Sequence, residues 1–254
     1  MLLVVDIGNT DITIGLHSGT EWTQHWRVPS LPDRPELFYG LKISENFLEA
    51  DLKAEYVERI VVSSVVPALT DTICRVMTNL FGREPLVLGP DVYSRLPIKV
   101  LNPYEIGSDL VANALAAYVR FGSACIVVDF GTALTFTAVS GSGEIMGVTI
   151  APGLRTALRA LSQNTAKLFD VPLEMPTSVL GRGTVHAIQA GVLIGYEGMV
   201  KHMVERIREE LKEPEVAVVA TGGLSAILSS LSGVYTAVDP DLTLTGLKLV
   251  YEYA

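Results

Sequence analysis

Two short segments of the chain combine an aspartate, a glycine and a hydroxyl side chain at a spacing suited to holding phosphate. They read DIGNT at residues 6–10 and DFGT at residues 129–132. Glycine lets the backbone bend and lets a phosphate approach closely, and the amides and side chains after it, such as those of Asn9 and Thr10, donate hydrogen bonds to phosphate oxygens. An aspartate repels phosphate, but the carboxylate of Asp6 suits a magnesium ion or its water shell. One such turn fits an ordinary hairpin equally well, whereas two copies favour a nucleotide site.

A third glycine-rich turn, TGG at residues 221–223, follows the apolar segment 215–220, which reads as a buried strand. Two phosphate-facing hairpins and a Gly-Gly turn after a strand together form a nucleotide clamp. The residues expected to bind ATP and its phosphates are Asp6, Gly8, Asn9, Thr10, Gly131, Thr132, Gly222 and Gly223.

The two aspartate turns must each be positioned by a strand on either side. Both follow a β-branched run and precede an alternating segment, at residues 11–15 and at residues 133–139, which is the pattern of a β-hairpin. Asp6 and Asp129 are 123 residues apart, almost half the chain. The sequence therefore predicts two related halves that each open with a hairpin.

Helical patterns lie between the predicted strands. Residues 110–121 have helical spacing and end at Gly122, a suitable C-cap, and residues 195–211 carry one apolar stripe. Strands interleaved with helices indicate an α/β protein. The proline-rich segment 28–35 is expected to form a mobile surface loop.

The composition excludes several classes of protein. Hydrophobic residues make up 49% of the 254 residues and charged residues 19%, which is too apolar for a disordered chain. The net charge of −9 disfavours nucleic acid as a partner. The two cysteines, Cys74 and Cys125, lie in apolar runs and the histidines lack a ligand-like spacing, so neither a disulfide scaffold nor a zinc site is expected. The apolar runs fall short of the ~18–20 residues of a membrane span, so we expect a cytoplasmic protein without a membrane partner.

The two aspartate turns and the Gly-Gly turn, in this order, resemble those of the superfamily that contains actin, the sugar kinases and the heat-shock chaperone ATPases. In that superfamily two halves close over ATP from opposite sides. The resemblance implies two RNase-H-like α/β domains, here an N-terminal domain at 1–115 and a C-terminal domain at 116–254, with a central cleft. We expect the turns of Asp6 and Asp129 to face that cleft within about 10 Å of each other, the scale of a triphosphate and its metal ion.

Further motifs along nearly the whole chain resemble those of the type III pantothenate kinases. They read DIGNT at 6–10, SSVVP at 63–67, NPYEIGSD at 102–109, VVDFGTALTF at 127–136, IAPGL at 150–154, NTAKL at 164–168, GRGT at 181–184, AIQAG at 187–191 and ATGG at 220–223. The resemblance implies ATP-dependent phosphorylation of pantothenate to 4'-phosphopantothenate, the first step of coenzyme A biosynthesis. It also implies a homodimer, a magnesium ion at Asp6, and a monovalent cation, K⁺ or NH₄⁺, with Asp129 as its ligand.

Asp109 is the candidate catalytic residue. It lies between Gly107 and the helix expected from Leu110, where an aspartate also serves as a cap or first-turn residue. In the functional interpretation its carboxylate accepts the proton of the substrate hydroxyl as that hydroxyl attacks the γ-phosphorus. The resemblance assigns this role to the aspartate of a Gly-x-Asp-Arg motif, on which Asp109 falls. The residues expected around the substrate are Val100, Gly107, Ser108, Asp109, Leu110 and Thr184.

The chain departs from the family pattern in this substrate-binding half. Leu110 stands where the motif has arginine, and Val100 stands where a tyrosine commonly precedes the Asn-Pro pair. An arginine is a bidentate partner for carboxylate or phosphate, and leucine cannot replace it. Either a basic residue such as Lys99, Arg155 or Arg182 compensates, unless these are plain surface charges, or the substrate differs, or activity is weak.

Three further positions each allow two interpretations. Thr184 matches a family position that contacts the substrate across the dimer, or it caps a helix beginning at Val185. Thr137 stands where the family often has aspartate, so its oxygen either serves the site or is placed outside it by strand alternation. Lys167 faces either an anion or the solvent.

Two functions from other classes stay open. One is a non-catalytic, nucleotide-binding accessory or regulatory paralogue, and the other is a kinase for a different small hydroxy acid. The changes at Leu110 and Val100 favour them. Retention of Asp109 argues against the first, because a decayed site has no need of a base.

Overall fold

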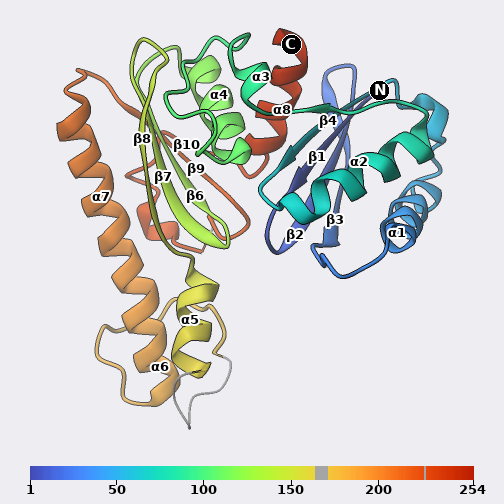
Figure 1. The fold of residues 1–254 in the computed structure, drawn as a ribbon. Coiled ribbons are helices and arrows are strands. Elements are labelled where there is room, and N and C mark those ends of the chain that lie inside the picture. The colour runs from blue at the N-terminus through green and yellow to red at the C-terminus, as the bar shows by residue number, and fades with distance from the viewer. Residues whose placement is uncertain (164–170, 226) are drawn as a thin grey trace. The chain divides into compact units, whose positions relative to one another are not determined.

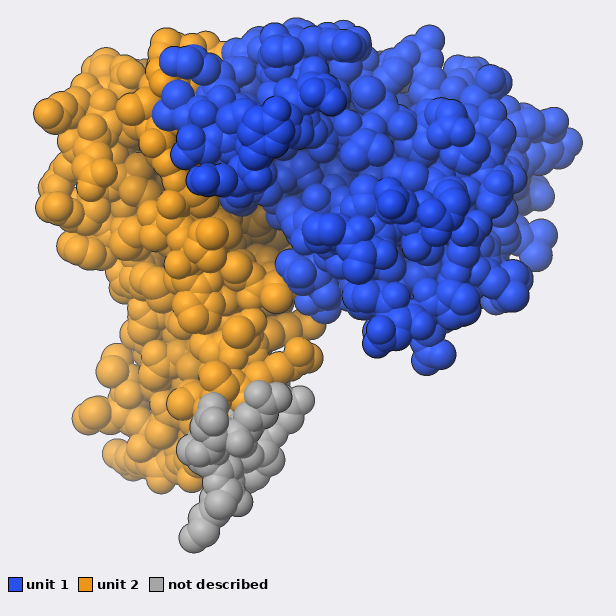
Figure 2. Space-filling view, viewed as in Figure 1, with its two compact units in different colours: residues 1–116, 242–254 blue, residues 117–241 orange. Residues whose placement is uncertain are grey.

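The structure is a computed structural model, and it describes residues 1–163, 171–225 and 227–254. The chain divides into two compact units (Figures 1 and 2). Unit 1 comprises residues 1–116 and 242–254, and unit 2 comprises residues 117–241. Each unit contains one five-stranded mixed sheet.

The sheet of unit 1 has the strand order β3-β2-β1-β4-β5. Its strands are β1 (Leu2–Ile7), β2 (Asp11–Ser18), β3 (Glu21–Pro29), β4 (Arg59–Ser64) and β5 (Leu86–Val87). The first three form an antiparallel meander, whereas β4 is parallel to both β1 and β5. Parallel neighbours need a crossover, and the crossovers contain α1 (Glu36–Glu49), η1 (Ala54–Tyr56) and α2 (Pro67–Phe81).

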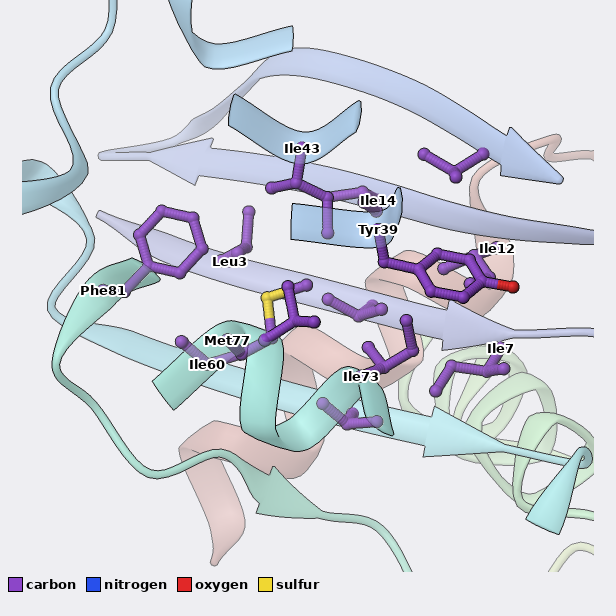
Figure 3. Close-up of a cluster of buried hydrophobic side chains, with 14 of the residues drawn as sticks. Leu3, Ile7, Ile12, Ile14, Tyr39, Ile43, Ile60, Ile73, Met77 and Phe81 are labelled. Carbon is purple, nitrogen blue, oxygen red and sulfur yellow. The ribbon is translucent and has the colours of Figure 1, made fainter. Parts of the chain in front are cut away.

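The core of unit 1 lies between this sheet and helices α1 and α2 (Figure 3). Alternation along the strands sends Leu3, Ile7 and Ile14 to this face. One turn apart on α2, Ile73 and Met77 point toward them. The opposite face of the sheet is covered by α8 (Leu242–Tyr253), which packs against β1 and β4.

The sheet of unit 2 has the strand order β10-β9-β6-β7-β8. Its strands are β6 (Cys125–Phe130), β7 (Ala133–Val139), β8 (Ile145–Pro152), β9 (Ala217–Thr221) and β10 (Ala237–Val238). Again the first three are antiparallel, and β9 is parallel to both β6 and β10. One face carries the core formed with α5 (Leu154–Gln163), the π-helical turn η2 (Ala190–Ile194) and α7 (Gly195–Leu211). The short α6 (Thr184–Gln189) precedes η2, and η3 (Ser229–Leu231) follows β9.

The two sheets repeat one topology, because β1 to β5 and β6 to β10 occupy equivalent places in the same order. This confirms the predicted α/β fold and both predicted hairpins. The helices predicted at 110–121 and 195–211 are α4 (Ser108–Phe121) and α7. None of the described helices combines the length and the apolarity needed to cross a bilayer.

The C-terminal helix α8 belongs to unit 1. The hydroxyl of Thr243 on α8 donates a hydrogen bond to Oδ1 of Asn113 on α4 at 2.8 Å. A domain limit at residues 115 and 116 stays a prediction, and a simple division of the chain at that point separates α8 from the unit with which it packs.

Candidate functional site

The alternation of β1 places Asp6 on the face of the sheet opposite the α1–α2 core. Asp6 is the register partner of Thr13 in β2 and of Ser63 in β4. Residues directly opposite each other share a face, so these three side chains lie together. The apolar alternation of three strands thus puts a carboxylate and two hydroxyls on the face where α4 and α8 lie.

The first predicted turn is a hairpin loop between β1 and β2. The N–H of Gly8 donates to the carbonyl of Asp11 at 3.1 Å, and the side chains of Asn9 and Thr10 are exposed at its tip. The loop is fixed from the side by Ser30, a buried residue that directly follows β3. These contacts leave Asn9 and Thr10 accessible to a ligand of this unit.

The second predicted turn and the Gly-Gly turn are brought together in unit 2. The N–H of Gly131 donates to the carbonyl of Ala133 at 3.0 Å. Gly222 has a φ of 88°, and a Cβ there would lie 2.5 Å from Oδ1 of Asp129 and 2.7 Å from the carbonyl oxygen of Phe130. Only glycine allows both this conformation and this approach, so the end of β9 rests directly on the Asp129 turn.

Hydroxyl groups surround Asp129 on its own face of the sheet. Thr135 of β7 and Thr221 of β9 are the register partners of Asp129, and Thr137 lies two residues along the same face. All three threonines are buried. Their hydroxyl oxygens have no hydrogen-bond partner among the described residues, so they are available as oxygen ligands. Such an oxygen-rich set suits a hard cation.

Asp109 lies in the first turn of α4 in unit 1. Its Oδ1 accepts a hydrogen bond from the N–H of Leu110 at 2.8 Å. Burial raises the pKa of the Asp109 carboxyl, and the hydrogen bond from Leu110 opposes the rise only in part. The carbonyl of Gly107 accepts from the N–H of Val111 at 3.2 Å, which places Gly107 at the cap position. A carboxylate whose proton affinity is raised by burial suits a general base.

The start of α4 is tied to the end of β4 by buried hydroxyls. Oγ of Ser108 lies 2.9 Å from Oγ of Ser63, accepts from the N–H of Ser64 at 3.0 Å, and donates to the carbonyl of Ser64 at 3.1 Å. Since the Ser108 proton goes to that carbonyl, the Ser63 hydroxyl is the donor between the two serines. Ser63 is the register partner of Asp6. The hydrogen bond between Ser63 and Ser108 therefore connects the neighbour of Asp6 in the sheet to the helix that carries Asp109.

Replacing Ser108 with alanine is expected to lower the free energy of unfolding by about 1–3 kcal/mol, because the backbone N–H and the backbone carbonyl of Ser64 both lose their hydrogen bond to the Ser108 hydroxyl. Urea denaturation measures the change. Thr243→Val is the matched control, since it removes another hydroxyl that anchors α4 at Asn113, away from the N-terminus of the helix. Ser108→Ala, unlike the control, should also lower kcat by displacing Asp109. Equal kcat values for the two variants would contradict this link.

A cavity of about 310 Å³ opens in unit 1 beside α3 (Pro90–Tyr93). Tyr93, Lys99 and Val100 are among its lining residues. Burial, and then the negative charge of Asp109, raise the pKa of the Tyr93 hydroxyl to about 12, so the charge of Asp109 acts on a residue that lines the cavity. The volume falls at the lower end of small-molecule sites.

The expected substrate residues other than Val100 are not among the residues that line this cavity. Leu110 is buried in α4, 9% exposed. The cap of α6 is Gly183, and Thr184 is the first residue of the helix, so the prediction of Thr184 as a cap is wrong. The Thr184 side chain is exposed and lines a groove of about 500 Å³. The segment NTAKL, with Lys167, lies outside the described residues.

Sequence reasoning missed three residues of these neighbourhoods. They are Ser30 at the first turn, Ser63 beside Asp6 on the adjacent strand, and Tyr93 in the cavity. The signal for Ser63 was present, since Ser63 opens the motif SSVVP, which directly follows the β-branched run at residues 60–62. Ser30 and Tyr93 carry no local pattern that marks them.

Solved structures show the same fold. A protein of the Baf family of transcriptional activators from Campylobacter jejuni has a TM-score of 0.60 at 19% identity, covering 98% of this chain and 97% of that one. A Sinorhizobium meliloti protein named as a 2-dehydro-3-deoxygalactonokinase has a TM-score of 0.62 at 12% identity, covering 99% and 96%. An inorganic polyphosphate/ATP-glucomannokinase from Arthrobacter has a TM-score of 0.52 at 13% identity, covering 100% and 99%. These similarities support a pair of RNase-H-like domains.

Sequence relatives carry more information, because their identity is high over the full length. The type III pantothenate kinase of Geobacter sulfurreducens is 41% identical over 252 residues, covering 99% of this chain and 98% of the relative. The enzyme of the same name from Myxococcus xanthus is 42% identical over 251 residues, covering 99% and 98%. The family model described as type III pantothenate kinase matches residues 2–206. The chain therefore belongs to the type III pantothenate kinase family.

Proposed function

We propose that this protein transfers the γ-phosphoryl group of ATP to pantothenate and so forms 4'-phosphopantothenate, the first step of coenzyme A biosynthesis. The observation that carries the proposal is the identity of about 41% to type III pantothenate kinases over the full length of the chain. The carboxyl of Asp109, whose pKa is raised by burial, adds support. The turns of Asp6 and Asp129 and the Gly-Gly turn would bind the nucleotide. The residues proposed for ATP are those expected from the sequence.

In the proposed reaction Asp109 acts as the general base. Its carboxylate accepts the proton of the substrate hydroxyl while that oxygen attacks the γ-phosphorus in line with the leaving oxygen of ADP. The bond from phosphorus to the bridging oxygen breaks, and the new phosphate ester forms. Ser108 holds the start of α4 through Ser63 and Ser64, so its proposed role is to position the base rather than to touch the substrate.

Asp6 is the proposed partner of magnesium. Within residues 1–163, 171–225 and 227–254, no cluster of three or more His, Cys, Asp or Glu side chains forms a dedicated metal cage. Magnesium in kinases is usually held by one or two carboxylates and by the phosphates themselves, so the donor set at the first turn fits. When bound, the ion would neutralise charge on the transferred phosphates.

Asp129 is the proposed ligand of a monovalent cation, K⁺ or NH₄⁺. The buried hydroxyls of Thr135 and Thr221, which lack a partner among the described residues, supply further oxygens on the same face. Thr137 adds another, in place of the aspartate common in the family. A cation held there would place a fixed positive charge beside the second turn.

The cavity at Tyr93 is the proposed pocket for the acid. Lys99 is exposed at its rim, and an ammonium group pairs with a carboxylate without the geometry that arginine requires. Lys99 would therefore supply the positive charge that is lost because Leu110 stands in place of the family's arginine. Thr184 is proposed to reach the substrate of a second subunit in a homodimer.

Lys99→Met is expected to raise the KM for pantothenate about tenfold, the worth of one charge-assisted contact, while kcat changes less. Lys53→Met, which removes an exposed lysine elsewhere in unit 1, is the control. Pantothenol, which lacks the carboxylate, should respond equally little to both substitutions. A pantothenate KM that is unchanged in the Lys99 variant would remove this residue from the pocket.

Product identification tests the function directly. The protein is incubated with ATP, magnesium, potassium and pantothenate, and the products are identified by mass spectrometry. Formation of 4'-phosphopantothenate supports the proposal. ATP binding without turnover of any alcohol would instead indicate an accessory protein, and turnover of another hydroxy acid alone would indicate a different kinase.

A further inference from the structure

Ser30 makes two hydrogen bonds to the carbonyl groups of the first turn. Its Oγ donates to the carbonyl of Gly8 at 2.5 Å, and its N–H donates to the carbonyl of Thr10 at 2.9 Å. Ser30 is 22 residues from Gly8 in the chain and 8% exposed. A single buried residue thus holds two carbonyl oxygens of a three-residue loop tip.

The second turn is held in the same way at the equivalent place. Gly153 donates its N–H to the carbonyl of Thr132 at 3.1 Å, and Oγ1 of Thr156 donates to the same oxygen at 2.8 Å. A Cβ on Gly153 would lie 2.4 Å from that oxygen, so the approach requires glycine. Here two donors hold one carbonyl of the turn, whereas in unit 1 the two donors of Ser30 hold two carbonyls.

The register shows that the two arrangements are equivalent. In unit 1, Pro29 is paired with Asp11, and Ser30 follows the proline. In unit 2, Pro152 is paired with Ala133, and Gly153 follows the proline. The internal repeat therefore extends beyond the hairpins to the end of the third strand, where the sequences Pro-Ser and Pro-Gly show little likeness.

The direction of these carbonyls fixes the direction of the neighbouring amides. In a planar trans peptide the C=O and the N–H point in opposite directions. Bonds from Ser30 to the carbonyls of Gly8 and Thr10 therefore turn the N–H groups of Asn9 and Asp11 away from Ser30. The bonds to Thr132 do the same for the N–H of Ala133.

We propose that Ser30 in unit 1, and Gly153 with Thr156 in unit 2, are positioning residues that hold the carbonyls of both phosphate turns away from the nucleotide. A carbonyl that points at a phosphate repels it, whereas an N–H donates to it. The inference rests on the proposed function, because the ligand it serves is the phosphate chain of ATP.

The hydroxyl of Ser30 is tested by Ser30→Ala, with Ser30→Thr as the conservative rescue. Thr23→Val is the matched control, because Thr23 lies on β3 and its hydroxyl also donates to a backbone carbonyl, that of Leu16 at 3.0 Å. Titration calorimetry with ATP, and with AMP, which lacks the terminal phosphates, gives the two dissociation constants for each variant. Thermal melts report stability separately.

Ser30→Ala should raise the Kd for ATP about tenfold, the worth of one amide-to-phosphate bond, and leave the Kd for AMP unchanged. Ser30→Thr should restore ATP binding, and Thr156→Val should weaken it through the second turn. If Ser30→Ala lowers the melting temperature as Thr23→Val does but leaves the ATP affinity intact, Ser30 has a structural role alone and the proposal fails. A wild-type protein that binds no ATP would overturn the proposed function as well, so the two failures are distinguishable.

Discussion

Asp109→Asn is expected to lower kcat by about 10²-fold or more, the usual worth of general-base catalysis. Asparagine keeps the size of the side chain and an oxygen that accepts the hydrogen bond from the N–H of Leu110, but it cannot accept the proton of the substrate hydroxyl. The KM for ATP should change little, because the nucleotide turns are untouched. Steady-state kinetics with a coupled ADP assay measures both parameters.

Glu105→Gln is the matched control, since Glu105 is an exposed carboxylate in the loop just before α4. It should retain wild-type kcat. A folded Asp109→Asn protein with wild-type kcat would show that Asp109 is a first-turn residue of α4 and no more.

The pH dependence provides a second test of Asp109. Burial raises the pKa of this carboxyl, and only the deprotonated form accepts a proton. The kcat of the wild type should therefore fall on acidification at a pH above the ordinary range of an aspartate. The folded state binds this proton more tightly than the unfolded state does, so the charged carboxylate lowers stability as pH rises through the raised pKa. Asp109→Asn should consequently be at least as stable as the wild type at neutral pH and lose that advantage in acid, as denaturation at several pH values would show.

Asp6→Asn is expected to reduce turnover about a thousandfold, on the order of 4 kcal/mol, because the amide is a poor ligand for magnesium and the charge on the phosphates is then less well neutralised. Higher magnesium concentrations should restore part of the activity. The activity is measured as a magnesium titration at saturating ATP.

Asp11→Asn is the control for the loss of one negative charge, since Asp11 starts β2 at the other end of the same loop. It should keep most of its activity. If both variants lose activity equally, the effect comes from the overall charge of the turn, and Asp6 has no separate role.

The sequence was sufficient to predict the repeated hairpins, because alternation of apolar residues and an Asp-x-Gly turn are local properties. It was also sufficient for α4 and α7, whose apolar spacing spans several turns. The assignment of α8 to unit 1 depends on contacts with β1 and β4, more than 170 residues away, which no local pattern contains.

In the candidate site, too, residues in local motifs could be predicted and residues that depend on distant contacts could not. Asp6, Asp109 and Asp129 could be predicted because each lies in a motif at the end of a strand or the start of a helix. Ser30 could not, because the proline-rich segment 28–35 reads as a surface loop. In the structure Val28 and Pro29 belong to β3, and Ser30 is buried against the first turn, so the prediction of a surface loop is wrong at its first three residues. The role of Ser30 depends on its contact with the first turn, which forms only when β1, β2 and β3 have paired.

The return of the chain to unit 1 through α8 has a consequence for synthesis on the ribosome. Unit 2 is one uninterrupted stretch, residues 117–241, whereas unit 1 lacks the helix that covers β1 and β4 until that stretch has been made. At about 5–20 residues per second, the wait is roughly 6–25 s. During that time the face of the unit 1 sheet that α8 later covers stays exposed in the nascent chain. Expression yield should therefore be sensitive to chaperones that shield such a face and to substitutions in α8.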